Sequence, residues 1–234
     1  MATDAIQLIN QQGIIQLDGS ERTLRRVASG TGSASSWTGT PNEAAIPTQT
    51  YTPIIFFRPA DDTVFVTNSG ILNNKFMYVS NGAFEWTAYG LDNPAAIDAT
   101  PYGAQVFDSL GRVIWDSRQD VMRITQVLQV NMPFPDNDSG NGTGPAPAYP
   151  YTLSFTPWGT RPWILLNSLL RFLDDNDTMI AASTLGTDRI VLQCGRRAYT
   201  GVAWDWASNN GGGIGYTRSY PGGRMTIPIG RRDT

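Results

Sequence analysis

A short block of sequence occurs twice in this chain, and it constrains the fold more than any other feature. Residues 7–18 (QLINQQGIIQLD) align with residues 105–116 (QVFDSLGRVIWD) at a constant offset, 105 − 7 = 98. Gln, Gly and Asp recur identically, and the positions between them keep their apolar or polar character. A self-match of this kind indicates a tandem array of one supersecondary unit. The sequence therefore predicts that the chain contains two copies of one unit.

The match continues beyond this block with increasing offsets, as loop insertions would produce. Arg25 aligns with Arg123 at the original offset. The later matches set Tyr51-Thr52 over Tyr151-Thr152, Lys75 over Arg189 and Phe84-Glu85-Trp86 over Trp204-Asp205-Trp206.

Composition favours β-structure in both copies. The 234 residues include 24 Gly and 15 Pro, with 11% aromatic and only 16% charged side chains, which is typical of strands and turns rather than exposed helices. We therefore expect an all-β fold of two tandem, internally duplicated β-sandwich-like units with long loops and a C-terminal extension. The expected boundaries are a first β unit at 1–91, a linker at 92–101, a second β unit at 102–208 and a C-terminal arm at 209–234.

Each unit is predicted to open with a β-hairpin. Asn10 to Gly13 and Asp108 to Gly111 place an Asx residue at the start of a turn and Gly at its end, which is typical of a four-residue hairpin loop. The tract 165–173 fits either a short helix or a strand followed by a turn, and the second is favoured. Alternating or apolar runs predict further strands at 63–67, 76–79, 83–89, 121–130, 153–155, 189–193 and 202–206, and long loops at 29–50 and 135–150.

The residue types that usually carry catalysis are scarce. The chain has no histidine, which excludes Ser-His-Asp catalysis and histidine metal sites. Cys194 is the one cysteine, so no intrachain disulfide forms, and its apolar neighbours favour a buried strand residue. Asp136-Asn137-Asp138 resembles the start of a calcium loop but lacks the later ligands. We expect no catalytic residue, no metal site and no cofactor. A hydrolase with paired carboxylates, for example Asp205 and Glu85, stays an alternative, although no spacing in the sequence selects a pair.

Charge and hydropathy restrict the partners. The net charge is −3 and Lys75 is the one lysine, so the chain offers no basic field to a nucleic acid or an anionic membrane. The N-terminus lacks a signal peptide, and no apolar stretch approaches the ~20 residues of a membrane-spanning helix. We expect no nucleic-acid partner, no membrane insertion, and folding in a cytoplasm.

One phrase resembles a known family. Residues 102–108 (YGAQVFD), continuing through Gly111 to Ser117, look like the opening module of small structural proteins from the tail tip of long-tailed, siphovirus-like bacteriophages. In that module a Gly-x-Gln-apolar-x-Asp/Asn strand turns through Gly into an apolar strand that ends in Asp-Ser/Thr. The first copy departs from it, with Ala5 in place of Gly and Gly19 in place of Ser/Thr. The resemblance implies a non-enzymatic virion component of the phage tail tip or baseplate, homo-oligomeric with a trimer as the first guess, that binds other phage tail proteins and is assembled in the bacterial host cytoplasm.

The aromatic residues near the C-terminus suggest a second function. Period-two alternation sends Phe84 and Trp86 to one face of a strand, most simply the core, and the same reasoning applies to Trp204 and Trp206. The alternative to a structural subunit is a receptor-binding module that holds a host surface glycan through the loop 135–150 or through aromatic and basic side chains. The predicted ligand or partner contacts are Tyr216, Arg218, Tyr220, Arg231 and Arg232.

Overall fold

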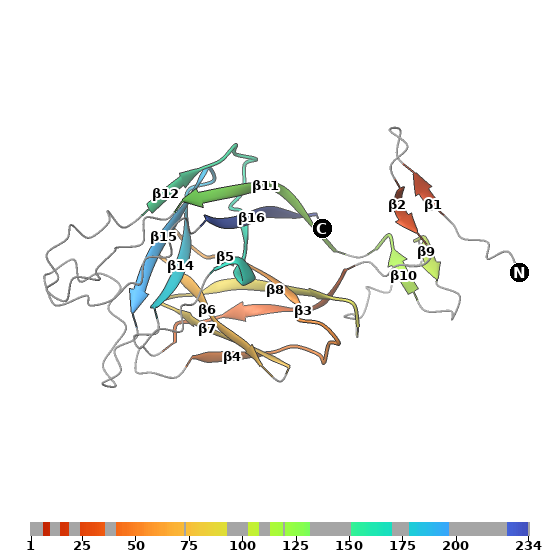
Figure 1. Ribbon diagram of the computed structural model, residues 1–234, viewed down its shortest axis with the longest axis horizontal. Helices are drawn as coiled ribbons and strands as arrows, with labels where there is room; N and C mark the ends of the chain where they lie inside the picture. Colours follow the sequence, from red (N-terminus) through yellow and green to blue (C-terminus); the bar gives the residue numbers. More distant parts are fainter. Residues whose placement is uncertain are drawn as a thin grey trace, which may run out of the picture.

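The computed structural model describes residues 7–9, 15–18, 24–35, 41–72, 74–92, 103–107, 113–118, 120–131, 151–169, 178–196 and 224–233. Strands make up nearly all of its regular structure, apart from one short 3-10 helix, η1 (Leu166–Ser168). The strands form two six-stranded and two two-stranded sheets, and every strand pair is antiparallel (Figure 1). The prediction of an all-β, sandwich-like fold is confirmed.

The two large sheets each draw strands from both halves of the chain. Sheet I has the order β11 (Val121–Asn131), β16 (Arg224–Asp233), β13 (Trp163–Leu165), β5 (Ile54–Pro59), β8 (Phe84–Gly90) and β3 (Arg25–Gly32). Sheet II has the order β12 (Tyr151–Ser154), β15 (Arg189–Arg196), β14 (Thr178–Leu185), β6 (Val66–Leu72), β7 (Lys75–Ser80) and β4 (Asn42–Ala45).

One hydrophobic core lies between these sheets and includes both halves. Phe76 of sheet II meets Trp86 of sheet I with ring centroids 5.0 Å apart, and Phe57 and Ile164 are fully buried in the same cluster. The halves join directly because Ile164 of β13 pairs with Phe57 of β5. The expectation of two separate units at 1–91 and 102–208 therefore needs correction: strands from the two halves complete a single sandwich.

The strand order has a symmetry of its own. Six strands follow the first hairpin (β3 to β8) and six follow the second (β11 to β16). Each strand of the first set can be matched with the strand at the same place in the second set, so that β3 corresponds to β11 and β8 to β16. In both sheets, the strand order counted from one edge is then the order of the corresponding strands counted from the other edge. A duplicated unit would produce this order, which supports the duplication; the duplication itself stays a prediction.

The same order tests the later sequence matches. Lys75 and Arg189 begin β7 and β15, which are counterparts, so this match agrees with the topology. Tyr151 begins β12, whose counterpart β4 ends before Tyr51, so that match disagrees. Phe84 begins β8, whose counterpart is β16 rather than the 204–206 segment, which lies beyond the described ranges.

The C-terminal arm predicted at 209–234 is wrong for its last part. Residues 224–233 form β16, which pairs with β11 along its whole length and with β13 on its other side. Met225, Ile227 and Ile229 of this strand are buried in the core. Alternation of apolar side chains drives burial of this face of β16, so the segment is an inner strand of the sandwich.

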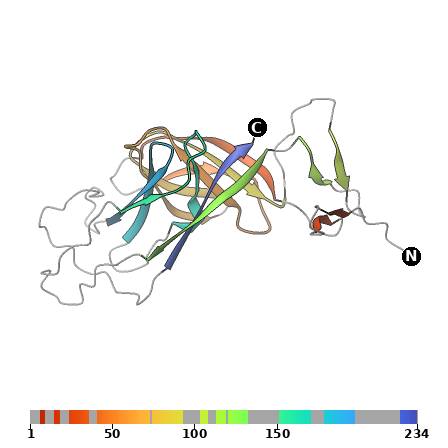
Figure 2. The same ribbon diagram turned by 90° about the horizontal axis from the view of Figure 1, so that it is seen from above.

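Both predicted hairpins are present and have one register. In the first, β1 (Gln7–Ile9) and β2 (Ile15–Asp18) pair Gln7 with Asp18; in the second, β9 (Gln105–Phe107) and β10 (Val113–Asp116) pair Gln105 with Asp116. Every pair and the register shift recur at the same offset, 105 − 7 = 98. Both hairpins lie at one end of the sandwich, apart from its sheets (Figures 1 and 2). Their loops, at 10–13 and 108–111, fall outside the ranges given above.

The remaining strand predictions have mixed outcomes. Those at 76–79, 121–130 and 189–193 lie within β7, β11 and β15, and the one at 83–89 matches β8 except for Ala83. Those at 63–67 and 153–155 overlap the start of β6 and the end of β12. Part of the loop predicted at 29–50 is wrong, because it contains the end of β3 and all of β4. The tract 165–173 begins as strand and continues into η1. The segments 135–150 and 202–206 are not among the described residues.

Candidate functional site

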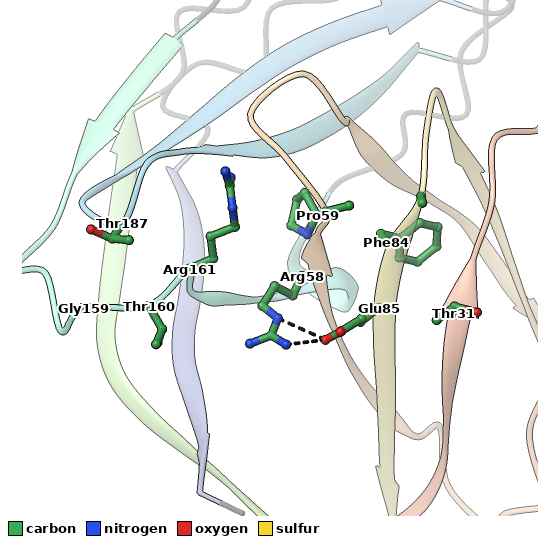
Figure 3. Close-up of a pocket in the computed structure, with 11 residues that line it drawn as sticks. Thr31, Arg58, Pro59, Phe84, Glu85, Gly159, Thr160, Arg161 and Thr187 are labelled. Carbon is green, nitrogen blue, oxygen red and sulfur yellow. Dashed lines mark hydrogen bonds and ion pairs between the residues drawn. The ribbon is translucent and has the colours of Figure 1, made fainter.

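An open groove of about 570 Å³ lies where the two halves of the chain meet. One wall is a row of outward-facing side chains on three adjacent strands, Thr31 of β3, Glu85 of β8 and Arg58 of β5, whose backbones pair in register. The other wall comes from the second half, through residues 159–161 before β13 and Thr187 in the turn between β14 and β15 (Figure 3). The pairing of β5 with β13 brings these segments together.

Arg58 is held between an acid and an aromatic ring. Its Nε and Nη2 donate hydrogen bonds to Oε2 of Glu85 at 3.0 and 2.5 Å (Figure 3). Its guanidinium carbon lies 4.9 Å from the centroid of the Trp163 ring, a cation–π distance. Because both charged side chains are partly exposed, the ion pair contributes about 0–1 kcal/mol. The pair mainly fixes where the donors of Arg58 point.

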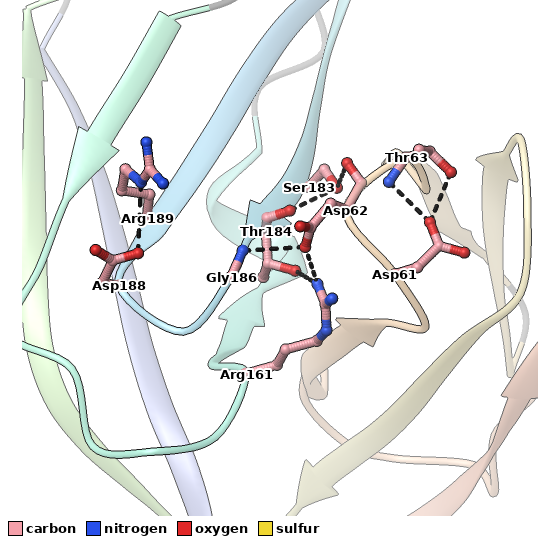
Figure 4. A network of polar contacts seen from close by, with 9 residues as sticks. All are labelled: Asp61, Asp62, Thr63, Arg161, Ser183, Thr184, Gly186, Asp188 and Arg189. Atoms are coloured by element: carbon pink, nitrogen blue, oxygen red, sulfur yellow. Dashed lines mark hydrogen bonds and ion pairs between the residues drawn. The ribbon is translucent and has the colours of Figure 1, made fainter.

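A second polar network lies beside the groove, where the two halves of the chain are in contact. Nη1 of Arg161 donates to Oδ1 of Asp62 and to Oγ1 of Thr184, at 2.5 and 2.6 Å (Figure 4). The same Asp62 oxygen accepts the backbone N–H of Gly186 at 3.0 Å, and the Ser183 hydroxyl donates to the Asp62 carbonyl at 3.2 Å. Asp62 precedes β6 in the first half and its partners belong to the second half. The network therefore ties the halves together beside the groove.

The groove suits polar binding better than acid–base chemistry. Glycoside hydrolysis needs two carboxyl groups across the sugar site. The residues that line this groove include one carboxylate, Glu85, and it is bonded to Arg58. Its other polar side chains are the threonines Thr31, Thr160 and Thr187 and the arginines Arg58 and Arg161. Within the described ranges there is no cluster of three or more metal-ligating side chains, and no helix long and apolar enough to cross a membrane.

The two predicted contact residues that the structure describes are both in β16. Arg232 forms an ion pair with Asp120, which also pairs with Arg26 of β3, so one carboxylate links the two ends of the chain. Arg231 lies in the β11–β16 ladder opposite Arg123. Arg232 therefore stabilises sheet I from within β16, and its role as a ligand or partner contact stays a prediction. Tyr216, Arg218 and Tyr220 lie outside the described residues.

The second hairpin carries a compact set of hydrogen bonds around Asp116. Its carboxylate is buried and accepts from Nε2 of Gln105 at 2.5 Å and from the backbone N–H and guanidinium of Arg118 at 2.6 to 2.9 Å. These bonds from Arg118 and Gln105 hold the pKa of Asp116 well below the usual aspartate range. Ser117 Oγ accepts the Ala104 N–H at 2.8 Å.

These contacts give a physical reason for the Gly-x-Gln and Asp-Ser elements of the motif. A Cβ on Gly103 would come within 2.8 Å of the Arg118 side chain, so Gly leaves room for that side chain. Gln and Asp face each other across the ladder, and Ser closes the strand end. The first hairpin has Gln7 opposite Asp18 in the same register.

Sequence reasoning did not find the groove. Its residues come from five separate segments of the chain. A local sequence pattern could at most have placed Thr31, Arg58 and Glu85 on the outward sides of their strands. Sequence reasoning did place Phe84 and Trp86 correctly: both are buried in the core, whereas Trp204 and Trp206 are beyond the described residues. Cys194 lies in β15, as expected for a strand residue.

Comparison of the chain with protein-family models, curated proteins and solved structures found no match. The functional conclusion therefore depends on the hairpin motif and on the geometry described above.

Proposed function

We propose that the chain is a structural component of a bacteriophage tail tip or baseplate that acts in virion assembly, with the two hairpins as its docking elements. The observation that carries this is the second hairpin, in which the residues of the tail-protein motif make one connected set of contacts through Gln105, Asp116 and Ser117. The resemblance supplies the assignment to a tail, and the hydrogen bonds of the second hairpin support a structural role for the module.

The hairpins have the features of surfaces that become ordered against a partner. A two-stranded sheet by itself is marginally stable in water, and neither hairpin pairs with a six-stranded sheet. Phe107 is 51% exposed, while its neighbour Val106 is buried. Aromatic side chains are enriched at protein–protein interfaces, so Phe107 is the side chain of the second hairpin that we expect to contact a partner. Other phage tail proteins are the proposed partners, and a homo-oligomer is the proposed state.

The test is co-sedimentation of the purified chain with disrupted tails of the phage that encodes it, together with immunogold labelling of intact virions. We expect label at the distal tail and binding that Phe107→Ser reduces at least tenfold. Tyr51→Ser is the matched control, because Tyr51 is 69% exposed on the sandwich rather than on a hairpin. Virions without label, and tails that do not retain the chain, would refute the proposal.

The groove favours a second candidate function, host attachment through a surface glycan. Hydroxyl and guanidinium groups fixed by Arg58–Glu85 and by Arg161–Asp62 are suitable hydrogen-bond partners for sugar hydroxyls. Binding of the purified chain to host cells should then fall with Thr31→Trp, which fills the groove from an exposed strand position. Unchanged binding of this variant to host cells would exclude the groove as the glycan-binding site.

A further inference from the structure

Of the four outer strands of the two sheets, β11 is the longest, and within the described residues it is the most open to pairing with another strand. The sheets end in β11 and β3, and in β12 and β4. Outer strands of stable proteins are usually short, charged or covered, because their free N–H and C=O groups otherwise recruit another strand. β4 and β12 have four residues each, and Glu43 of β4 is bonded to Lys75. β3 begins with Arg25-Arg26, and its outward Ser29 and Thr31 are polar.

By contrast, β11 is long, nearly uncharged and apolar on its outer side. It has eleven residues, about 37 Å at about 3.4 Å per residue, with Arg123 as its one charged side chain. Val121, Ile124 and Val127 are 45%, 52% and 53% exposed. These are three of the six large apolar side chains that are exposed in the described part of the chain.

A β-bulge gathers two of these side chains on one face. The register of β11 against β16 shifts between Ile124 and Gln126, so Thr125 is an extra residue. Without it, Ile124 and Val127 would face opposite sides of the sheet, since they are an odd number of positions apart. Leu128 packs against the core, which places Val127 on the outer face, and Met122 packs with the outer cluster of Phe56, Tyr89 and Trp163, which places Ile124 there too.

We propose that β11 pairs with β11 of a second copy of this chain, antiparallel and about a two-fold axis, so that sheet I continues across two molecules. The chain already uses this type of contact internally, where β13 of one half pairs antiparallel with β5 of the other. A two-fold contact is self-complementary: the register that sets Ile124 opposite Val127 of the second copy also sets Arg123 opposite Leu128, so the two arginines do not meet. The outer apolar side chains then cover each other.

This contact differs from the trimer that the resemblance implies, and it does not depend on the proposed function. A closed trimer needs two different surfaces that fit each other. The other long outer strand of sheet I, β3, offers polar side chains and arginines, which do not complement the apolar side of β11. The pairing of β11 with itself therefore predicts a dimer of about 51 kDa from chains of 25.5 kDa.

The experiment is sedimentation velocity of the full chain over a concentration series, because an edge contact smaller than the standard interface of about 1,600 Å² should dissociate on dilution. We expect a reversible monomer–dimer equilibrium. Val127→Lys should weaken it at least about tenfold, because the lysine would be buried against the second copy. Tyr51→Lys is the control at an exposed position outside β11, 69% exposed against 53% for Val127, and should dimerise as the unmodified chain does.

Hydrogen exchange supplies a readout that needs no variant. The outward amides of β11 should gain protection as the concentration rises, while those of β3 should not. Circular dichroism would check the fold of Val127→Lys, and Ile124→Lys is the replacement if it does not fold. A monomer at every concentration, a trimer, or a dimer that persists in these lysine variants would overturn the proposal.

Discussion

Replacing Ile164 by alanine tests whether the two halves form one cooperative sandwich. Ile164 is fully buried in β13 at the seam between the halves, opposite Phe57. The substitution removes three buried carbon groups, which at about 0.8 kcal/mol each give a transfer cost of about 2.4 kcal/mol. The cavity left in a well-packed core adds to this, for a total of about 3–5 kcal/mol. We expect this loss in the free energy of unfolding, measured by urea denaturation.

The decisive readout is where the loss appears. If the sandwich is one unit, tryptophan fluorescence and circular dichroism give coincident transitions, and native-state hydrogen exchange weakens equally in β8 and β15, one strand from each half. Leu24→Ala is the matched control, since Leu24 is 46% exposed and its loss should change stability by less than about 0.5 kcal/mol. Two separate transitions, or lost protection in β15 alone, would refute the argument for a shared core.

Three further predictions concern other contacts. Gly32→Ala should cost about 1–3 kcal/mol, because the new Cβ would come within 2.1 Å of the buried Phe84 ring; a urea midpoint equal to that of the unmodified chain would contradict it. Because the folded-state pKa of Asp116 is lowered, its stabilisation of the second hairpin is fully present above the unfolded value of about 3.9 and is lost only as the pH falls through the lower folded value. NMR shifts of residues 103–118 should follow that course, and Asp116→Asn should weaken the hairpin even at neutral pH. Asp62→Ala should lower stability by about 1–2 kcal/mol in urea, since it leaves Arg161 without its carboxylate, and an unchanged midpoint would count against the network.

The hairpins could be predicted from the sequence because their contacts are local. Gln7 and Asp18 are close in the chain, and the turn between them has its own residue pattern. β4 could not be found in this way. Its sequence, Asn-Glu-Ala-Ala, has weak strand propensity, and it is a strand because β7 supplies a hydrogen-bonding partner and Lys75 pairs with Glu43.

β16 was missed for a different reason. The alternation of Met225, Ile227 and Ile229 is a clear strand signal, but Pro228 and the neighbouring Gly and Arg residues favour an arm. The structure accommodates this proline because the short ladder with β13 extends only over Ile229 and Gly230, so no hydrogen bond from position 228 to β13 is needed. The groove could not be predicted from the sequence, because no local pattern brings Thr31, Arg58 and Thr187 together.

The pairing of β11 with β16 also means that, during synthesis, β11 is made well before its partner strand. The ladder begins with Asn131 opposite Arg224, and 224 − 131 = 93 positions separate them. At about 5–20 residues per second, a ribosome takes roughly 5–20 s to make that interval. Throughout it the nascent β11 lacks its partner on one side and is open on the other, so two growing chains on one messenger RNA can meet through this strand before either has folded. A chaperone that binds the nascent β11 should therefore improve the yield of correctly paired protein.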